Sequence, residues 1–219
     1  MRADFHYTLT QLDNVPEATG ACALPPRFNI APGQSAPVIV TRDGGKRIEQ
    51  LRWGLLPHWR GRGVRRGPLM HAAPLEAVAG TPLLRDSFKN RRCLVLADGC
   101  YAWRELKQPI WFHPEPRTVI AFAGVWDVNE DDEVASFAVL TGPPLVTRVN
   151  DAMPIVLDPS SYDAWLDPEV CAEDATELLG GVALVGWRAD AVSTRMSAVT
   201  NDDRECIEPI GNPNQTELF

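Results

Sequence analysis

The chain of 219 residues contains no long apolar run. A membrane-spanning helix needs about 18 or more consecutive apolar residues. The opening stretch, Met1–His6, also lacks the apolar core of a secretory signal behind its one positive charge. We therefore expect a cytoplasmic protein with no membrane partner.

The cysteines are few, odd in number and without close spacing; they are Cys22, Cys93, Cys100, Cys171 and Cys206. A disulfide framework or a zinc site needs paired or closely spaced cysteines. We expect buried free thiols, no metal and no cofactor.

An excess of positive charge is absent as well, since the net charge is −8. Non-specific binding to nucleic acid depends on Lys and Arg contacts with phosphates. Any DNA contact must therefore come from a local basic patch.

What the chain does contain is 19 prolines and 16 glycines, which divide it into short elements. β-branched and aromatic residues predict six strands: Pro37–Arg42, Arg47–Trp53, Arg92–Ala97, Thr118–Trp126, Ser136–Thr141 and Pro154–Leu157. The sequence Asp43-Gly44-Gly45 predicts a hairpin turn between the first two. Helices are predicted at Thr81–Asn90, with Thr81 as cap and Pro82 at its first position, and at Ser160–Leu166 and Cys171–Leu179.

This pattern predicts one α+β domain with a mixed, mostly antiparallel, barrel-like β core and a few peripheral helices. At this length one well-buried core is expected. The domain should cover residues 1–210, and the turn-forming residues from Gly211 should begin a flexible tail over residues 211–219.

Five segments are hard to explain by core packing alone. They are Leu24–Pro32 (LPPRFNIAP), Leu51–Trp59 (LRWGLLPHW), Ala97–Trp103 (ADGCYAW), Asn150–Pro154 (NDAMP) and Val192–Arg195 (VSTR). In order and spacing they resemble the SRAP family, the SOS-response-associated peptidase proteins, from about Tyr7 to Pro209.

The resemblance implies a mixed, β-rich fold that grips single-stranded DNA. In active members, removal of the initiator methionine exposes a cysteine. Its α-amine and thiol capture the aldehyde of an abasic site as a thiazolidine, while an Asn, a Glu and a His position the sugar and move protons. A secondary peptidase activity removes short leader segments ahead of that cysteine.

This sequence departs from the family at each functional position. The cysteine's place is taken by Arg2 or, if the opening is aligned on Tyr7, by Asp4; the Asn, Glu and His correspond to Ala72, Ala102 and Asn150. Alanine cannot transfer a proton, and asparagine cannot replace histidine as a base near neutral pH. We therefore expect a non-catalytic protein, a pseudoenzyme, that works by binding.

Other residues offer an alternative in which activity persists. His71 could approach the former pocket, although it could equally be a partly exposed polar residue. Cys100 lies near the former acid, but we expect a buried thiol there. The α-amine of Met1 could form a reversible Schiff base with an aldehyde.

The stretch Trp59–Arg66, called here the arginine segment, suggests a DNA contact. Arginine pairs with phosphates, and tryptophan can stack on unpaired bases. The residues predicted to face single-stranded DNA are Trp53, Trp59, Arg60, Arg62, Arg65 and Arg66. The alternative is a core tryptophan followed by a solvated arginine loop.

The last residues, Gln215-Thr216-Glu217-Leu218-Phe219, resemble the bacterial sliding-clamp-binding motif. A Leu-Phe pair can fill an apolar cleft while the Gln amide satisfies polar groups at its rim. The predicted contacts are Gln215, Leu218 and Phe219, and the predicted partner is the β sliding clamp of DNA polymerase III. Phe219 could instead pack back on the domain. We expect a DNA-damage adaptor at the nucleoid or replication fork, together with translesion or SOS repair proteins.

Overall fold

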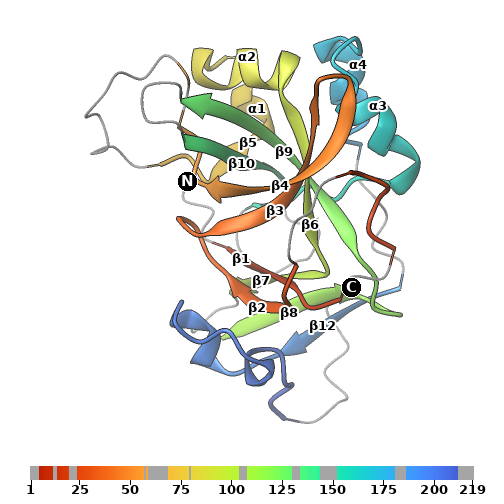
Figure 1. Ribbon diagram of the computed structural model, residues 1–219. Coiled ribbons are helices and arrows are strands. Elements are labelled where there is room, and N and C mark those ends of the chain that lie inside the picture. The colour runs from red at the N-terminus through yellow and green to blue at the C-terminus, as the bar shows by residue number, and fades with distance from the viewer. Residues whose placement is uncertain are drawn as a thin grey trace.

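The computed structural model describes residues 5–11, 14–19, 24–56, 58, 69–78, 80–103, 108–129, 134–143, 152–180 and 186–211. Their strands form two sheets, one of seven strands and one of five. In Figure 1 the larger sheet occupies the upper part of the molecule, with the helices around it, and the smaller sheet lies below.

The larger sheet closes into a barrel. Its strand order is β11-β10-β4-β3-β6-β9, and β9 pairs back onto β10, so that five strands form a ring. The ring strands are β3 (Ser35–Arg42), β4 (Gly45–Trp53), β6 (Arg92–Ala97), β9 (Ile120–Asn129) and β10 (Val134–Gly142). Only the β4–β10 pair in this ring is parallel. The predicted mixed, mostly antiparallel barrel is therefore confirmed.

Two shorter strands outside the ring pair with β10. Strand β5 (Ala72–Pro74) pairs with β10 in parallel, and β11 (Met153–Pro154) pairs with it antiparallel. The strand predicted at Pro154–Leu157 is thus shorter than expected, and Val156 adds only an isolated bridge to Phe122. The other five predicted strands are present, with ends shifted by a few residues.

The hairpin between β3 and β4 has the turn that its sequence predicts. Arg42 pairs with Gly45, which leaves Asp43 and Gly44 as a two-residue loop. Their φ angles are 51° and 74°. Two positive φ angles define a type I′ turn, whose twist matches that of the flanking strands.

The smaller sheet was not predicted as a unit. Its order is β12-β8-β7-β1-β2, and every pair is antiparallel. The strands are β1 (His6–Leu9), β2 (Arg27–Ile30), β7 (Gly99–Trp103), β8 (Pro109–Pro114) and β12 (Trp187–Ala191). Several carry proline or charged residues, so their local composition does not indicate strands.

Buried polar groups join the smaller sheet to the barrel. The carboxylate of Asp98, which is fully buried at the β6–β7 junction, accepts hydrogen bonds from the Thr8 hydroxyl at 2.5 Å and the Thr10 amide at 2.8 Å. The Gln11 amide donates to it as well, at 3.1 Å. Asp98 thereby fixes the end of β1 against the barrel.

Helices cover one end of the barrel, above the β-rich core (Figure 1). They are α1 (Leu75–Val78), α2 (Pro82–Asn90), α3 (Tyr162–Leu166) and α4 (Ala172–Glu177). The 3₁₀ helix η2 (Pro159–Ser161) precedes α3, while η3 (Thr194–Ser197) and η4 (Arg204–Cys206) lie beside the smaller sheet. The predicted helices are confirmed, although Thr81 caps α2 without a side-chain hydrogen bond.

Two buried side chains attach α3 to the barrel. Trp165 is fully buried, and its indole Nε1–H donates to the Cys93 carbonyl at 2.9 Å. Arg92 on β6 donates from Nε to the Trp165 carbonyl at 2.7 Å. The short helix is therefore held by tertiary contacts, since an isolated helix of this length is unstable in water.

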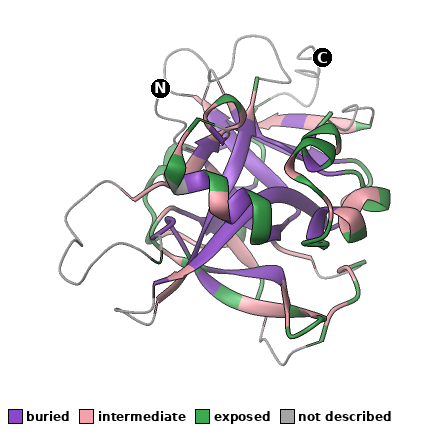
Figure 2. Ribbon diagram, turned by 90° about the horizontal axis from the view of Figure 1, so that it is seen from above, coloured by how far each residue is buried: buried purple, intermediate pink, exposed green. Residues whose placement is uncertain are grey.

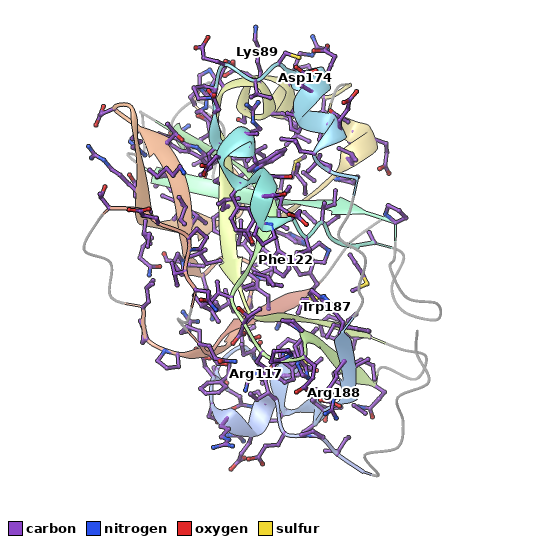
Figure 3. All side chains as sticks on the ribbon, turned by 90° about the vertical axis from the view of Figure 1, so that its right-hand side faces the viewer. Lys89, Arg117, Phe122, Asp174, Trp187 and Arg188 are labelled. Atoms are coloured by element: carbon purple, nitrogen blue, oxygen red, sulfur yellow. The ribbon has the colours of Figure 1, made fainter. Side chains whose placement is uncertain are left out.

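The core runs through both sheets. Figure 2 shows that the strands are largely buried, whereas the helices and connections carry the exposed residues. In Figure 3 Phe122 lies in the middle of the molecule, with Lys89 and Asp174 towards the helical end and Arg117 and Arg188 towards the other. The ring of Phe122 on β9 meets the ring of Tyr7 on β1 in an edge-to-face arrangement, with 5.8 Å between the ring centroids.

The described thiols are free and mostly buried. Cys93, Cys100 and Cys206 are buried as predicted, but Cys171 is exposed because it caps α4, where its sulfur accepts a hydrogen bond from the Asp174 amide. No group of three or more metal-ligating side chains occurs among the described residues. Within the same residues, no helix is long and apolar enough to span a membrane.

Candidate functional site

Only part of the predicted site lies within the described residues. Trp53, Ala72 and Ala102 are described. The remaining predicted site residues lie outside them: Arg2, Asp4, Trp59, Arg60, Arg62, Arg65, Arg66, Asn150, Gln215, Leu218 and Phe219.

Strand β7 places Ala102 between the two sheets. Along the β1–β7 pair, His6 lies opposite Tyr101 and Tyr7 lies opposite Cys100. Because side chains alternate along a strand, Cys100 and Ala102 share one face and Tyr101 and Trp103 share the other. Cys100 and Ala102 belong to the main core, whereas Tyr101 belongs to a separate cluster beside η3 and η4. Ala102 is 3% exposed.

Trp53 occupies the same junction. Its ring is fully buried, 5.1 Å from that of Phe5 and 5.0 Å from that of Tyr7 between centroids, and it is stacked on Phe137. The indole Nε1–H donates to the His71 carbonyl at 2.8 Å. Trp53, which the sequence predicted to face DNA, lies with its ring in the core of this structure, because the end of β4 turns the ring inward.

Strand β5 begins with Ala72, directly after His71, whose carbonyl and ring contact Trp53. Ala72 pairs with Val139 on β10 and is partly exposed. The His71 ring meets the Trp53 ring edge-on at 6.3 Å between centroids. Trp53 thus links His71, the residue before β5, with the aromatic rings of Phe5 and Tyr7.

The chemistry available at this junction is limited. Burial raises the pKa of the Cys100 thiol to about 12, so it remains protonated at neutral pH and is a poor nucleophile. The Tyr7 hydroxyl is fully buried and has no hydrogen-bond partner among the residues that the structure describes, and desolvation raises its pKa well above the usual range.

A second cluster lies where the chain leaves the barrel towards the arginine segment. The Leu56 amide donates to Ser136 Oγ at 2.8 Å, and the His58 amide donates to Asp127 Oδ2 at 3.0 Å. The His58 ring Nδ1 lies 2.9 Å from the same Asp127 oxygen. Arg91 pairs with the other oxygen, at 3.1 Å from Nε.

Sequence reasoning missed this second cluster. Leu56 and His58 stand inside a motif that we singled out, but Ser136, the partner of Leu56, is 80 residues away along the chain, and Asp127, the partner of His58, is 69 residues away. Asp127 and Ser136 are directly paired across the β9–β10 ladder. A local pattern carries no signal of such a pair, because it depends on the closed barrel.

Solved structures from two bacteria share this architecture. A phage-related protein from Bordetella bronchiseptica is 26% identical, covering 85% of this chain and 93% of its own, with a TM-score of 0.70. A protein from Bacteroides thetaiotaomicron has a TM-score of 0.72 at 19% identity, covering 81% of this chain and 82% of its own. The second likeness concerns the fold alone.

The closed barrel joined to a second sheet defines an α+β protein of the SRAP fold. The model of the family "SOS response associated peptidase (SRAP)" matches residues 2–199, and the chain belongs to this family.

Curated relatives cover most of the chain. The abasic site processing protein YoqW of Bacillus subtilis is 28% identical over 193 residues, which span 84% of this chain and 86% of that protein. The abasic site processing protein YedK of Escherichia coli is 25% identical, over 84% of this chain and 85% of that protein.

Proposed function

We propose that this SRAP-family protein serves the DNA damage response as a non-catalytic adaptor that binds single-stranded DNA and is recruited to the sliding clamp. The observation that supports this most is Ala102. At the position where the family resemblance implies an acid, a methyl group is packed at 3% exposure in the core. Ala72 likewise lacks the side-chain amide of the asparagine that the family resemblance implies at that position. A protein that retains the family fold but lacks the side chains that transfer protons can still bind DNA or another protein.

The DNA-binding part rests on the arginine segment. Four arginines within seven residues can pair with several phosphates, and each released counterion makes binding weaker at higher salt. We expect single-stranded DNA to bind at low salt, with an affinity that falls steeply as salt is raised.

The test is a titration of labelled single-stranded DNA at several salt concentrations. Replacing Arg60, Arg62, Arg65 and Arg66 together by alanine should lower both the affinity and its salt dependence. Arg195→Ala is the matched control, because Arg195 pairs with Asp203 beside the smaller sheet. Equal affinities in all three proteins would contradict the DNA-binding proposal.

The clamp part rests on the motif at residues 215–219. Burying a Leu-Phe pair contributes a few kcal/mol before ordering costs. Contacts of the Gln amide and the main chain must supply the rest of the roughly 8 kcal/mol that an affinity in the micromolar range requires. Replacing Gln215, Leu218 and Phe219 by alanine should abolish binding to the purified bacterial clamp.

The matched control for the clamp is alanine at Thr216 and Glu217, the two variable positions of the same motif. This variant should bind like the wild type. If the wild type does not bind the clamp, or if both variants bind equally well, the recruitment proposal is wrong.

An active abasic-site protein is the second candidate, because curated relatives are named abasic site processing proteins. The test is incubation with single-stranded DNA containing one abasic site, followed by a denaturing gel with and without borohydride reduction. A stable adduct without reduction would overturn the non-catalytic proposal. An adduct seen only after reduction would show Schiff-base chemistry at an amine.

A further inference from the structure

A buried histidine lies between the last two strands of the smaller sheet. His113 on β8 is 3% exposed and lies directly opposite Arg188 on β12. Its ring Nδ1 is 3.0 Å from the Pro114 carbonyl oxygen, and its ring Nε2 is 3.1 Å from Oδ2 of Asp190. The ring also stacks on Trp111, with 4.0 Å between the ring centroids. Both ring nitrogens are therefore within hydrogen-bonding distance of an oxygen atom.

These two oxygen atoms decide how many protons the ring must carry. A main-chain carbonyl can only accept a hydrogen bond, and an ionised carboxylate is likewise only an acceptor. A neutral imidazole has one N–H group, so it can donate to Pro114 or to Asp190 but not to both. Both contacts are hydrogen bonds only when the ring carries two protons and a positive charge. In that state the contact between His113 and Asp190 is an ion pair inside the sheet.

The charges around the ring agree with a charged histidine. The Arg188 guanidinium lies 3.4 Å from each of two carboxylates, and a second arginine lies 4.9 Å from the centre of the Trp111 ring and 3.5 Å from a buried carboxylate. With two ring protons, the positive and negative charges among these described residues are equal in number, whereas a neutral ring leaves one carboxylate in excess. The charged groups are Arg117 and Arg188, and Asp98, Glu115 and Asp190.

Strand β12 connects this ion pair to the segment that covers the outer face of the smaller sheet. The Ala191 carbonyl accepts from the Ile210 amide at 2.8 Å, and Val192 forms a bridge with Pro209. Between these two attachments, residues 193–208 include η3 and η4 and are called here the cover segment. Its buried side chains form one cluster with the sheet, made of Tyr101, Trp111, Val192, Met196, Cys206 and Ile207. A weaker attachment of β12 therefore loosens the cover segment as well.

We propose that His113 and Asp190 form a proton-dependent latch that holds β12 and the cover segment on the smaller sheet. With two ring protons, both hydrogen bonds exist and the latch is closed. When the pH rises and the ring loses one proton, either Pro114 or Asp190 faces a nitrogen lone pair, and a buried acceptor without a donor is costly. The latch therefore opens towards alkaline pH. It needs neither DNA nor the sliding clamp, so it goes beyond the proposed function.

The decisive variant is Asp190→Asn. An asparagine amide can donate to a ring nitrogen that has no proton, while Nδ1–H of the neutral ring still donates to the Pro114 carbonyl. In this variant the bridge is complete with a neutral ring, which reverses its response to pH. Asp163→Asn is the matched control, because Asp163 is 83% exposed and pairs with Lys46 on the barrel.

The readout is amide hydrogen exchange between about pH 5 and about pH 9, the range in which histidine side chains change charge. NMR of the His113 ring nitrogens counts their protons in the same samples. Protection factors divide out the ordinary rise of exchange with pH, and β6 in the barrel is the internal reference. In the wild type, protection of β12 and η3 should fall about tenfold as His113 loses its second proton, with β6 unchanged. Asp163→Asn should behave like the wild type, and in Asp190→Asn the fall should be absent or reversed.

Three results would overturn the latch. They are a His113 ring with one proton over the whole pH range, a β12 whose protection stays constant as the second proton leaves, and equal pH responses in the wild type and Asp190→Asn. If circular dichroism shows that Asp190→Asn does not fold, His113→Gln is the second variant. A glutamine amide does not titrate, so a fall as large as that of the wild type would also contradict the latch. DNA and clamp binding are measured separately, so their failure leaves the latch unaffected.

Discussion

The indole Nε1–H of Trp53 donates to the main-chain carbonyl of His71 at 2.8 Å, inside the core. This bond joins the end of β4 to the strand that carries Ala72. Trp53 is therefore a structural residue in this chain, and its substitution should change stability before it changes DNA binding.

We predict that Trp53→Phe lowers the free energy of unfolding by about 1–3 kcal/mol, since it removes this hydrogen bond and part of a buried ring. Trp53→Ala should cost about 3–5 kcal/mol. Chemical denaturation measures both. Trp187→Phe, a change at a partly exposed ring, is the control and should cost less. If Trp53→Phe keeps full stability but loses DNA affinity, the ring contacts DNA after all.

Asp98 gives the second prediction. Its buried carboxylate accepts from Thr8, Thr10 and Gln11, and Arg117 lies 3.5 Å away. Asp98→Asn would place an N–H group against these donors, so we predict a loss of about 2–4 kcal/mol in unfolding free energy. Thermal and chemical unfolding measure this loss. A variant as stable as the wild type would show that the network contributes little.

Alkaline pH gives the third prediction. Burial raises the pKa of Cys100 to about 12, and desolvation chiefly raises that of Tyr162 to about 12 as well. Burial also raises the pKa of Cys93 far above its ordinary value of 9.0. These groups keep their protons in the folded state where the unfolded chain releases them. Their contribution is complete below pH 9 and is lost as the pH rises through the folded values.

Between the pKa of a thiol in the unfolded chain and its raised pKa in the folded protein, each buried thiol should lower the unfolding free energy by about 1.4 kcal/mol per pH unit. Denaturant unfolding from pH 8 to pH 11 measures the slope. Cys100→Ala should make the slope shallower, whereas Cys171→Ala, at an exposed thiol, should change it less. A flat profile above pH 9 would contradict the burial of these groups.

Restoring the family's acid gives the fourth prediction. Ala102→Glu would bring a carboxylate into a site where the native methyl is 3% exposed, so we expect a loss of about 2 kcal/mol or more at pH 7. Desolvation raises the pKa of such an acid, so the protein should be relatively more stable below pH 4 than above it. We also expect no adduct with abasic DNA. An adduct from a stable variant would show that the pocket keeps its catalytic geometry.

The local sequence was sufficient to predict those turns, strands and helices that are specified by neighbouring residues. The Asp43-Gly44 turn, the strand over Arg92–Ala97 and the helix after Thr81 are predictable because backbone preference and side-chain pattern agree there. The order and spacing of the motifs likewise indicate the family from the sequence alone. The absent amide and acid at Ala72 and Ala102 are evident in the sequence too, because they depend on residue type alone.

Only the tertiary structure decided which of these residues meet. Strands β8 and β12 carry proline and charged residues, and they pair because the fold brings them together. The same is true of the inward turn of Trp53 and of the Ser136–Asp127 rung that holds His58. Residue type determines what a side chain can do chemically, but closure of the barrel determines which distant side chain lies within hydrogen-bonding distance.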